Sequence, residues 1–314
     1  MNIQYVEPLS RGFGRMKKAL FQPFDLKKWF VVGFTAFLAG LTDCHGGGGS
    51  GWRGGGRIDW EDIIYFPERA WYWLLDHPIW FMVIVFGIFV VFMLALLFTW
   101  LGSRGKFMFL DNVVHDRAQV AVPWREYRTE GNSLFVWSFC YGLLVFAVVI
   151  LYLIVCFSSL YSLYESSVDT AVLIVPAILM ILGLLAIVIL ASYVELLLYD
   201  FVVPIMYKYR ITMLKALRMF LNLFSSHFPF FVGYGFVMLL LGILIFIGIV
   251  VVGFLTCCIG FVLLIIPYIN AVVLLPISYT LRAFSVEFLE QFGPDYHIFP
   301  RPETSQIVME TKQI

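Results

Sequence analysis

The stretch Leu190–Phe236, LASYVELLLYDFVVPIMYKYRITMLKALRMFLNLFSSHFPFFVGYGF, decides the fold class of this chain. An apolar helix carries Glu195 and Asp200 out of the membrane, a basic segment follows, and a second apolar helix enters from Phe230. In the basic segment the polar side chains share about 120° of a helical wheel, and Phe, Leu and Met residues fill the rest. The stretch therefore predicts two membrane spans joined by a helix that lies on the membrane surface.

The composition of the whole chain agrees with this interpretation. Hydrophobic residues make up 61% of the sequence and charged residues only 13%, whereas soluble domains carry about 25% charged residues. Aromatic residues reach 18%, which is typical of proteins with aromatic belts at the membrane surfaces. The formal net charge of zero gives no support for a nucleic-acid partner, which requires a basic face.

Apolar runs predict an all-α polytopic protein with six transmembrane helices. The runs are Trp29–Leu41, Ile79–Leu101, Leu134–Phe157, Ala171–Leu190, Phe230–Leu255 and Ile259–Leu281. A spanning helix needs about 20 residues, so the first run is a short crossing, thins the bilayer locally, or begins earlier at Phe24. The run from Ala171 continues past Asp200 to Pro204, which predicts a helix that projects beyond the hydrocarbon.

These spans divide the chain into three parts. Residues 1–28 form a basic amphipathic segment that Pro23 should end, residues 29–290 the membrane domain, and residues 291–314 a polar tail. Within the membrane domain, residues 44–78 form a glycine-rich and aromatic loop outside the membrane. Leu41–Cys44 faintly resembles the cleavage box of lipoproteins, in which the cysteine is lipidated, but Asp43 stands where that box has Gly or Ala, so we favour an uncleaved helix.

The distribution of basic residues predicts the orientation. With both termini in the cytoplasm and six spans, all of the 21 lysines and arginines lie on the cytoplasmic side except Arg53, Arg57 and Arg69. Basic residues bias loops towards the cytoplasm. We therefore expect a multi-pass protein of the bacterial cytoplasmic (inner) membrane, with both ends inside.

Short similarities predict that the six helices are three tandem hairpins. Phe30–Phe34, Phe135–Phe139 and Phe230–Tyr234 each begin with Phe and have a small residue fourth and an aromatic residue fifth. Asp111 and Asp200 each begin an Asp-x-Val-Val sequence eight residues after a serine, and Glu287 stands at the matching place in a looser third copy. Because each unit spans twice, the copies would be parallel repeats.

The pattern YDFVVPIMYKYRITMLKALRMFLNLF, with the opening KALFQPFDLKKWFVVGFTAFLAGL and its glycine-rich loop, resembles an uncharacterised group of bacterial six-helix membrane proteins. That group includes the membrane domain joined to some bacterial glycerophosphodiester phosphodiesterases. The resemblance covers most of residues 10–290 and implies the six-helix fold. No catalytic barrel exists in this sequence, so the phosphodiesterase activity does not carry over.

Two sets of charged residues are candidates for function. The acids nearest the membrane are costly there and often functional; they are Asp111, Glu195, Asp200 and Glu287. We expect them to pair with basic residues at the interface, Lys208, Lys215, Arg218 or Arg282, in preference to forming a proton or ion site. The candidate contacts to anionic lipid headgroups are Arg11, Arg15, Lys18, Lys208, Lys215 and Arg218.

Other chemistry has weaker signals. Asp111, His115 and Asp116 fall within two helical turns, but a single histidine with carboxylates is a poor metal motif, and we expect a solvated loop without a metal. Of the five cysteines, Cys156 could form a disulfide with Cys257 or Cys258 in an oxidising exterior, although packing is the commoner role in apolar helices. No nucleophile elbow, phosphate loop or zinc-protease helix is present, so we expect no catalytic site and no cofactor.

The leading hypothesis is a non-enzymatic membrane protein that organises, anchors or assists a partner, with membrane lipids and copies of itself or other membrane proteins as partners. The alternative is a transporter of a lipid or hydrophobic solute, with the acids coupled to protons. A membrane-embedded enzyme is a third hypothesis, which would need several polar residues converging in one pocket.

Overall fold

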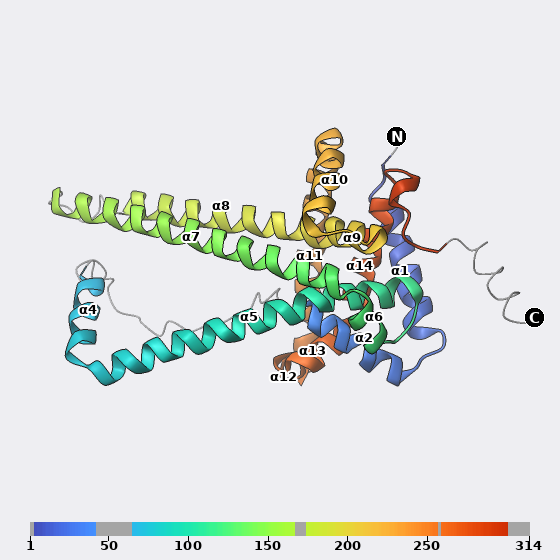
Figure 1. Ribbon diagram of the computed structural model, residues 1–314, viewed down its shortest axis with the longest axis horizontal. Coiled ribbons are helices and arrows are strands. Elements are labelled where there is room, and N and C mark those ends of the chain that lie inside the picture. Colours follow the sequence, from blue (N-terminus) through green and yellow to red (C-terminus); the bar gives the residue numbers. More distant parts are fainter. Residues whose placement is uncertain (1–2, 42–64, 167–173, 257–258, 301–314) are drawn as a thin grey trace, which may run out of the picture. The chain divides into compact units, whose positions relative to one another are not determined.

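The computed structural model describes residues 3–41, 65–166, 174–256 and 259–300. Within these ranges the chain is helical and has no strand. The chain divides into two compact units: unit 1 comprises residues 1–43, 99–137 and 193–314, and unit 2 comprises residues 44–98 and 138–192. Figure 1 labels the helices along the chain.

Four helical segments are long and apolar enough to cross a membrane. They are Pro78–His115, Arg128–Ser166, Ile174–Tyr209 and Phe228–Leu255. A fifth candidate is a bent pair, Pro267–Val273 with Leu275–Glu290. The described residues thus form a helical protein with four to five potential membrane spans, and the sixth predicted span is not confirmed.

The first predicted span is the short one. Helix α2 runs from Leu26 to Ala39, 14 residues, and begins where the Asp25 side chain accepts a hydrogen bond from the Lys27 backbone N–H. At a rise of 1.5 Å per residue it is about 21 Å long, less than the roughly 30 Å of the hydrocarbon. The alternative start at Phe24 does not lengthen it, since the helix begins at Leu26.

The last predicted span is broken into three helices: α12 (Ile259–Ile265), α13 (Pro267–Val273) and α14 (Leu275–Glu290). The axes of α13 and α14 differ by 64°. Proline lacks a backbone N–H and its ring collides with the preceding turn. Accordingly, Pro267 is the first residue of α13 and Pro276 the second residue of α14. Hydropathy alone predicted one continuous span here, because it does not register where a proline interrupts an apolar run.

Two helices extend further than predicted. Helix α5 (Pro78–His115) continues 14 residues past Leu101, and helix α7 (Arg128–Ser166) includes the polar residues that we expected to begin a link at Ser158. Neither extension contains a proline, so nothing stops the helix until Asp116 takes a left-handed backbone conformation with φ 51°. Helix α5 begins at Pro78, one residue before the predicted run. The predicted continuation of the fourth run to Pro204 is confirmed, since α8 (Ile174–Leu197) continues through a π-helical turn (Leu198–Val202) into α9 (Val203–Tyr209).

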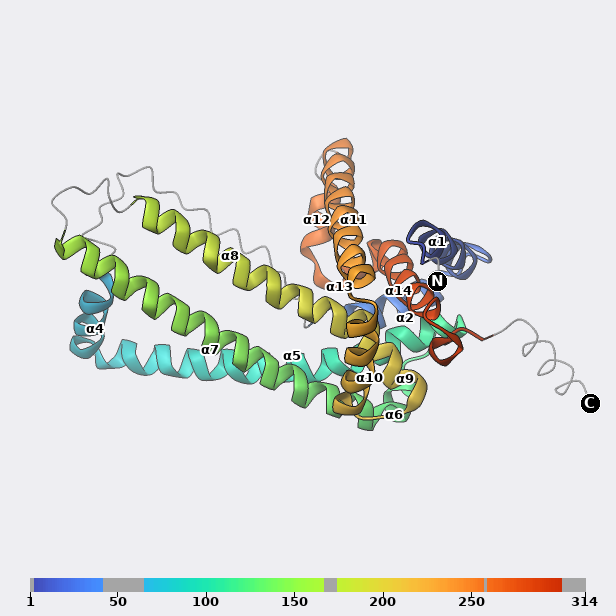
Figure 2. The same ribbon diagram turned by 90° about the horizontal axis from the view of Figure 1, so that it is seen from above.

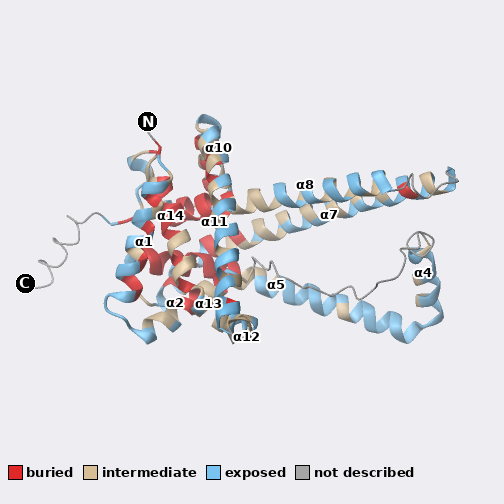
Figure 3. Ribbon diagram, turned by 180° about the vertical axis from the view of Figure 1, so that it is seen from behind, coloured by how far each residue is buried: buried red, intermediate tan, exposed pale blue. Residues whose placement is uncertain are grey.

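Unit 1 has a dense core of aromatic side chains. Helix α1 (Val6–Phe21) packs along α14, α2 packs on α13, and α10 (Met213–Ser226) packs on α9 and the π-helical turn. The ring of Phe201 in this turn contacts Phe220, Phe231, Tyr234 and Phe288 with centroid distances of 4.8 to 5.9 Å. Figure 3 shows buried residues concentrated in these helices.

Close helix contacts in unit 1 depend on glycine. A Cβ atom added at Gly105 of α5 would lie 2.5 Å from the carbonyl carbon of Leu38 and 2.6 Å from the backbone nitrogen of Ala39. Only a residue without a side chain allows two backbones to approach this closely. Gly105 therefore sets the contact between α5 and the end of α2.

Unit 2 consists of apolar helical segments whose side chains are mostly exposed, together with α4 (Phe66–Asp76). Figures 1 and 2 show α7 and α8 running beside each other. The Tyr152 hydroxyl donates to the Met180 carbonyl at 2.9 Å, and Tyr141 donates to the Ala191 carbonyl at 2.9 Å. A helix that is apolar on all sides is suited to lipid, so unit 2 has the character of a membrane-embedded region.

Candidate functional site: a buried carboxylate cluster

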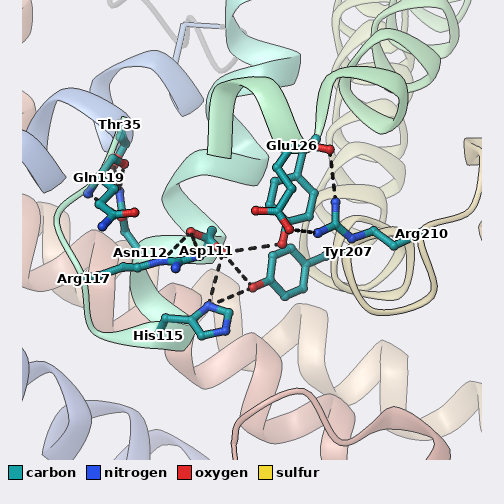
Figure 4. Close-up of polar contacts among 10 residues, drawn as sticks. Thr35, Asp111, Asn112, His115, Arg117, Gln119, Glu126, Tyr207 and Arg210 are labelled. Atoms are coloured by element: carbon teal, nitrogen blue, oxygen red, sulfur yellow. Dashed lines mark hydrogen bonds and ion pairs between the residues drawn. The ribbon is translucent and has the colours of Figure 1, made fainter. Parts of the chain in front are cut away.

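Asp111, near the end of α5, is a buried acid surrounded by several hydrogen-bond donors. Its side chain is fully buried and receives two hydrogen bonds from Arg117, from Nε to Oδ2 at 3.0 Å and from Nη2 to Oδ1 at 2.9 Å. Figure 4 shows the guanidinium lying alongside the carboxylate. A two-pronged arginine–carboxylate pair is among the strongest polar contacts in proteins. The expectation of a solvated loop at Asp111 is therefore wrong.

The loop after α5 brings Arg117 back onto Asp111. Asp116 takes the left-handed conformation that ends the helix. Asn112 then holds Gln119: its amide nitrogen donates to the Gln119 carbonyl at 3.0 Å, and its oxygen accepts from the Gln119 N–H at 3.0 Å. Asn112 also donates to Thr35 Oγ1 of α2 at 3.3 Å. The loop is thus closed on itself and tied to a neighbouring helix.

Two tyrosines complete the shell around the carboxylate. Tyr207 of α9 donates from its hydroxyl to Asp111 Oδ1 at 2.9 Å, and the Tyr127 hydroxyl lies 3.5 Å from the same atom. The two rings stack with centroids 4.9 Å apart. Burial raises the pKa of the Tyr127 phenol to about 12, so this phenol is a neutral donor at physiological pH.

His115 and Arg210 lie at the edge of the cluster. His115 Nδ1 is 3.2 Å from Asp111 Oδ1 and 3.1 Å from the Tyr207 hydroxyl. The guanidinium carbon of Arg210 stands 3.8 Å from the centre of the Tyr127 ring, and Arg210 forms an ion pair with Glu126. A cation over an aromatic face is attracted by the ring's quadrupole, and this contact holds Tyr127 against the carboxylate.

The other two acids of the predicted repeat are also buried beside an arginine. Asp200, in the π-helical turn, accepts from the Tyr234 hydroxyl at 2.8 Å and lies 3.7 Å from Arg282 Nη1. Glu287 of α14 accepts from Arg15 Nε of α1 at 2.6 Å. The expected pairing of these acids with basic residues is found, with Arg282 the one partner that we had predicted.

Arg282 is the largest of the fully buried side chains. Its Nη1 donates to the Tyr199 carbonyl at 2.7 Å, and its guanidinium lies 4.3 Å from the centre of the Tyr199 ring. Its Nε and Nη2 atoms have no hydrogen-bond partner among the residues that the structure describes. A buried charge is costly unless it is paired, so Asp200 compensates Arg282 as much as Arg282 compensates Asp200.

Glu195 differs from these three acids. It lies on α8, five residues before Asp200, and is half-buried. The sequence placed Glu195 with the other three acids, but its side chain is only half-buried whereas theirs are buried.

The six candidate headgroup contacts fall into two groups. Arg11 and Arg15 face Glu287, and Lys208 donates to the carbonyls of Pro294 and Asp295. Of these six cations, Lys18, Lys215 and Arg218 have exposed side chains and no ion pair with another described residue. Arg11 and Arg15 thus have Glu287 of α14 as a partner within the chain, and the headgroup contacts of all six residues stay predictions.

The metal and cysteine hypotheses have limited tests. The described residues contain no group of three or more His, Cys, Asp or Glu side chains that could hold a metal ion. Cys140 and Cys156 are free thiols. Cys44, Cys257 and Cys258 lie outside the described residues, so the lipidation and disulfide alternatives stay predictions.

Sequence reasoning missed Arg117, Tyr127 and Tyr207 as members of the cluster. Arg117 has a local signal, since it follows Asp111 by six residues across a predicted helix end. Tyr207 has none, because it stands 96 residues away and reaches Asp111 only through the packing of α9 near α5.

Residues 3–289 match a family of unknown function (DUF7544). No curated protein sequence and no solved structure matches the chain. The family match carries no link to the glycerophosphodiester phosphodiesterases, so that resemblance stays a prediction.

Proposed function

The chain belongs to the family of unknown function DUF7544, and we propose that it is a non-enzymatic, multi-pass protein of the bacterial inner membrane that organises or anchors a partner there. One observation carries the proposal: the three repeat acids Asp111, Asp200 and Glu287 are each buried against an arginine. Each also contacts a residue from a distant part of the chain, which is Tyr207 for Asp111, Arg282 for Asp200 and Arg15 for Glu287. These acids join the helices of unit 1 together. Their role is to build a rigid body.

The same contacts argue against proton-coupled transport through Asp111. A coupling acid must take up and release its proton as the transporter moves, which requires access to water and a change of partner. Asp111 has no exposed surface and holds a two-pronged arginine and the Tyr207 hydroxyl at hydrogen-bonding distance. Each of these donors favours the permanently charged form.

We propose six crossings with both termini in the cytoplasm, α2 and the broken α12–α14 segment being the first and last. The charge distribution supports this topology, since residues 42–78 and 158–173 contain only three basic residues, Arg53, Arg57 and Arg69. Reporter fusions after residues 50 and 168 test it. Both reporters should lie outside the cytoplasm. A cytoplasmic reporter at residue 50 would show that α2 does not cross the membrane and would contradict the six-crossing topology.

The proposed attachment to the membrane surface uses α10. Met213, Ala216, Phe220 and Leu223 of this helix are buried, while Leu214, Lys215, Arg218 and Leu221 are exposed. Leucines beside cations on one exposed face are typical of a helix lying at an anionic leaflet. Membrane lipids are the first partner in this proposal, and a second copy or another membrane protein is the partner that the rigid body would position.

The experiment is a flux assay on the purified protein in proteoliposomes that contain a pH-sensitive dye, with an imposed pH gradient. The wild type and the variants Asp111→Asn, Glu195→Gln and Asp200→Asn should all give the proton flux of empty liposomes. Glu165→Gln, an exposed acid in unit 2, is the matched control. A wild-type flux that a folded Asp111→Asn variant loses would overturn the proposal in favour of the transporter.

A further inference from the structure

Unit 1 contains a cavity of about 370 Å³ between α11 (Phe228–Leu255) and the broken helices α12–α14. Its lining belongs to Ile245, Gly248, Ile249, Val252, Gly253, Gly260, Leu263, Leu264, Val273, Leu274 and Ile277. No residue in this set has a polar side chain. The volume lies within the range of about 300–1,000 Å³ that is usual for small-ligand sites.

The interruptions of the last predicted span create this space. The chain breaks before Pro267 and turns by 64° between α13 and α14, so Val273, Leu274 and Ile277 stand at the bend and not along a straight helix. On the opposite wall, Gly248 has open space where a side chain would be, with no atom within 4 Å of an added Cβ. The cavity therefore exists because one wall bends away and the other lacks a side chain.

Polar backbone and hydroxyl groups near the cavity are satisfied within the chain. The Thr256 hydroxyl donates to the Val252 carbonyl at 2.9 Å and accepts from the Gly260 N–H at 3.1 Å. The Phe261 ring packs against Gly253. The cavity wall thus offers no hydrogen bond to an occupant.

The apolar lining of the cavity and its position beside a potential membrane span indicate which class of ligand it would bind. A wall without polar groups favours a hydrocarbon, since a polar group moved there would lose its hydrogen bonds to water. Helix α11 is long and apolar enough to span a membrane, so the medium around this cavity is lipid. An empty apolar cavity also forfeits the dispersion contacts of its lining, which favours filling it.

We propose that this cavity binds one acyl chain of a membrane phospholipid, with the headgroup remaining outside. The inference goes beyond the proposed organising role and does not depend on it. A bound chain would make a lipid part of unit 1, because it would join α11 to α12–α14 where side chains do not fill the space.

The test is photolabelling in nanodiscs made with a phosphatidylcholine that carries a diazirine in one acyl chain. Labelled peptides are mapped by mass spectrometry. In the wild type, label should concentrate on the α11 and α12 residues of the cavity wall. Gly248→Leu places a side chain into the cavity, and its labelling there should fall about tenfold, the change that a loss of about 1.4 kcal/mol in binding produces.

Gly242→Leu is the matched control, since Gly242 lies on the same helix, also has open space around an added Cβ, and does not line the cavity. This variant should keep wild-type labelling. If Gly248→Leu does not fold, Leu264→Phe fills the cavity from the opposite wall and provides the same measurement.

Labelling spread evenly along α11, or labelling that Gly248→Leu leaves unchanged, would overturn the proposal. A parallel experiment uses a diazirine fatty acid in nanodiscs of unlabelled lipid. Cavity labelling by the fatty acid but not by the phosphatidylcholine would also overturn it, since it would assign the site to a free fatty acid.

Discussion

Unit 1 and unit 2 stabilise their helices in different ways. In unit 1, charged and aromatic side chains are buried against one another, as at Asp111, Asp200 and Phe201. In unit 2, the long helical segments expose most of their apolar side chains, and two tyrosine-to-carbonyl hydrogen bonds join α7 to α8. The difference indicates that unit 1 supplies its own interior, whereas unit 2 requires lipid or another protein around it.

The largest expected effect comes from Asp200→Asn. It leaves the Arg282 charge buried without its carboxylate, and breaking a buried pair in this way costs about 3–5 kcal/mol. The matched change in unit 2 is Glu165→Gln. Glu165 is an exposed acid, so we expect this variant to change the free energy of unfolding by less than about 0.5 kcal/mol. Equilibrium unfolding by SDS in mixed micelles measures both.

A double variant sharpens this prediction. Asp200→Leu with Arg282→Met removes both charges, and it should be more stable than Asp200→Asn because no unpaired charge remains. If the single and the double variant were equally destabilised, the loss of stability would not come from an unpaired charge on Arg282.

The next effect compares two glycines of α5. Gly105→Ala places a Cβ atom against the backbone of α2 in unit 1 and should destabilise by about 1–3 kcal/mol through overpacking. Gly87→Ala in unit 2 meets no atom within 4 Å, and should leave stability unchanged or raise it slightly. Thermal denaturation in detergent compares the two, and equal shifts in melting temperature would contradict the close packing at Gly105.

The smallest expected difference between the two units comes from two tyrosine hydroxyls. Tyr207→Phe removes a hydrogen bond to the charged Asp111 and should cost about 1.5–3 kcal/mol. Tyr152→Phe in unit 2 removes a bond to a carbonyl between two apolar helices, where such bonds average about 0.6 kcal/mol. The same SDS titration measures both, and a larger loss for Tyr152→Phe would mean that unit 2 depends on internal polar contacts after all.

The helices of this protein were predicted better than their ends. Runs of about 20 apolar residues predict spans because only a helix satisfies its backbone within lipid, and four such segments are found. The ends of α5 and α7 were missed because polar residues without a proline continue a helix as readily as they form a loop. The break at α12–α14 was missed for the opposite reason, since Pro267 and Pro276 lie within an apolar run.

The candidate site was predicted in part. Asp111, Asp200 and Glu287 were identified by their matching positions at helix ends, and their pairing with basic residues was expected. Arg282 was the one named partner that the structure confirms. Arg15 was predicted as a headgroup contact, and its bond to Glu287 was not foreseen because it depends on the packing of α1 along α14.

Composition and the positions of basic residues suffice to predict a helical chain with several potential spans, because burial in lipid acts on each segment separately. Whether each acid faces water, lipid or an arginine depends on contacts between residues as far apart as Arg15 and Glu287. The buried carboxylate cluster and the apolar cavity are therefore products of tertiary packing: the first needs α9 to place Tyr207 on Asp111, and the second needs the 64° bend beside Gly248.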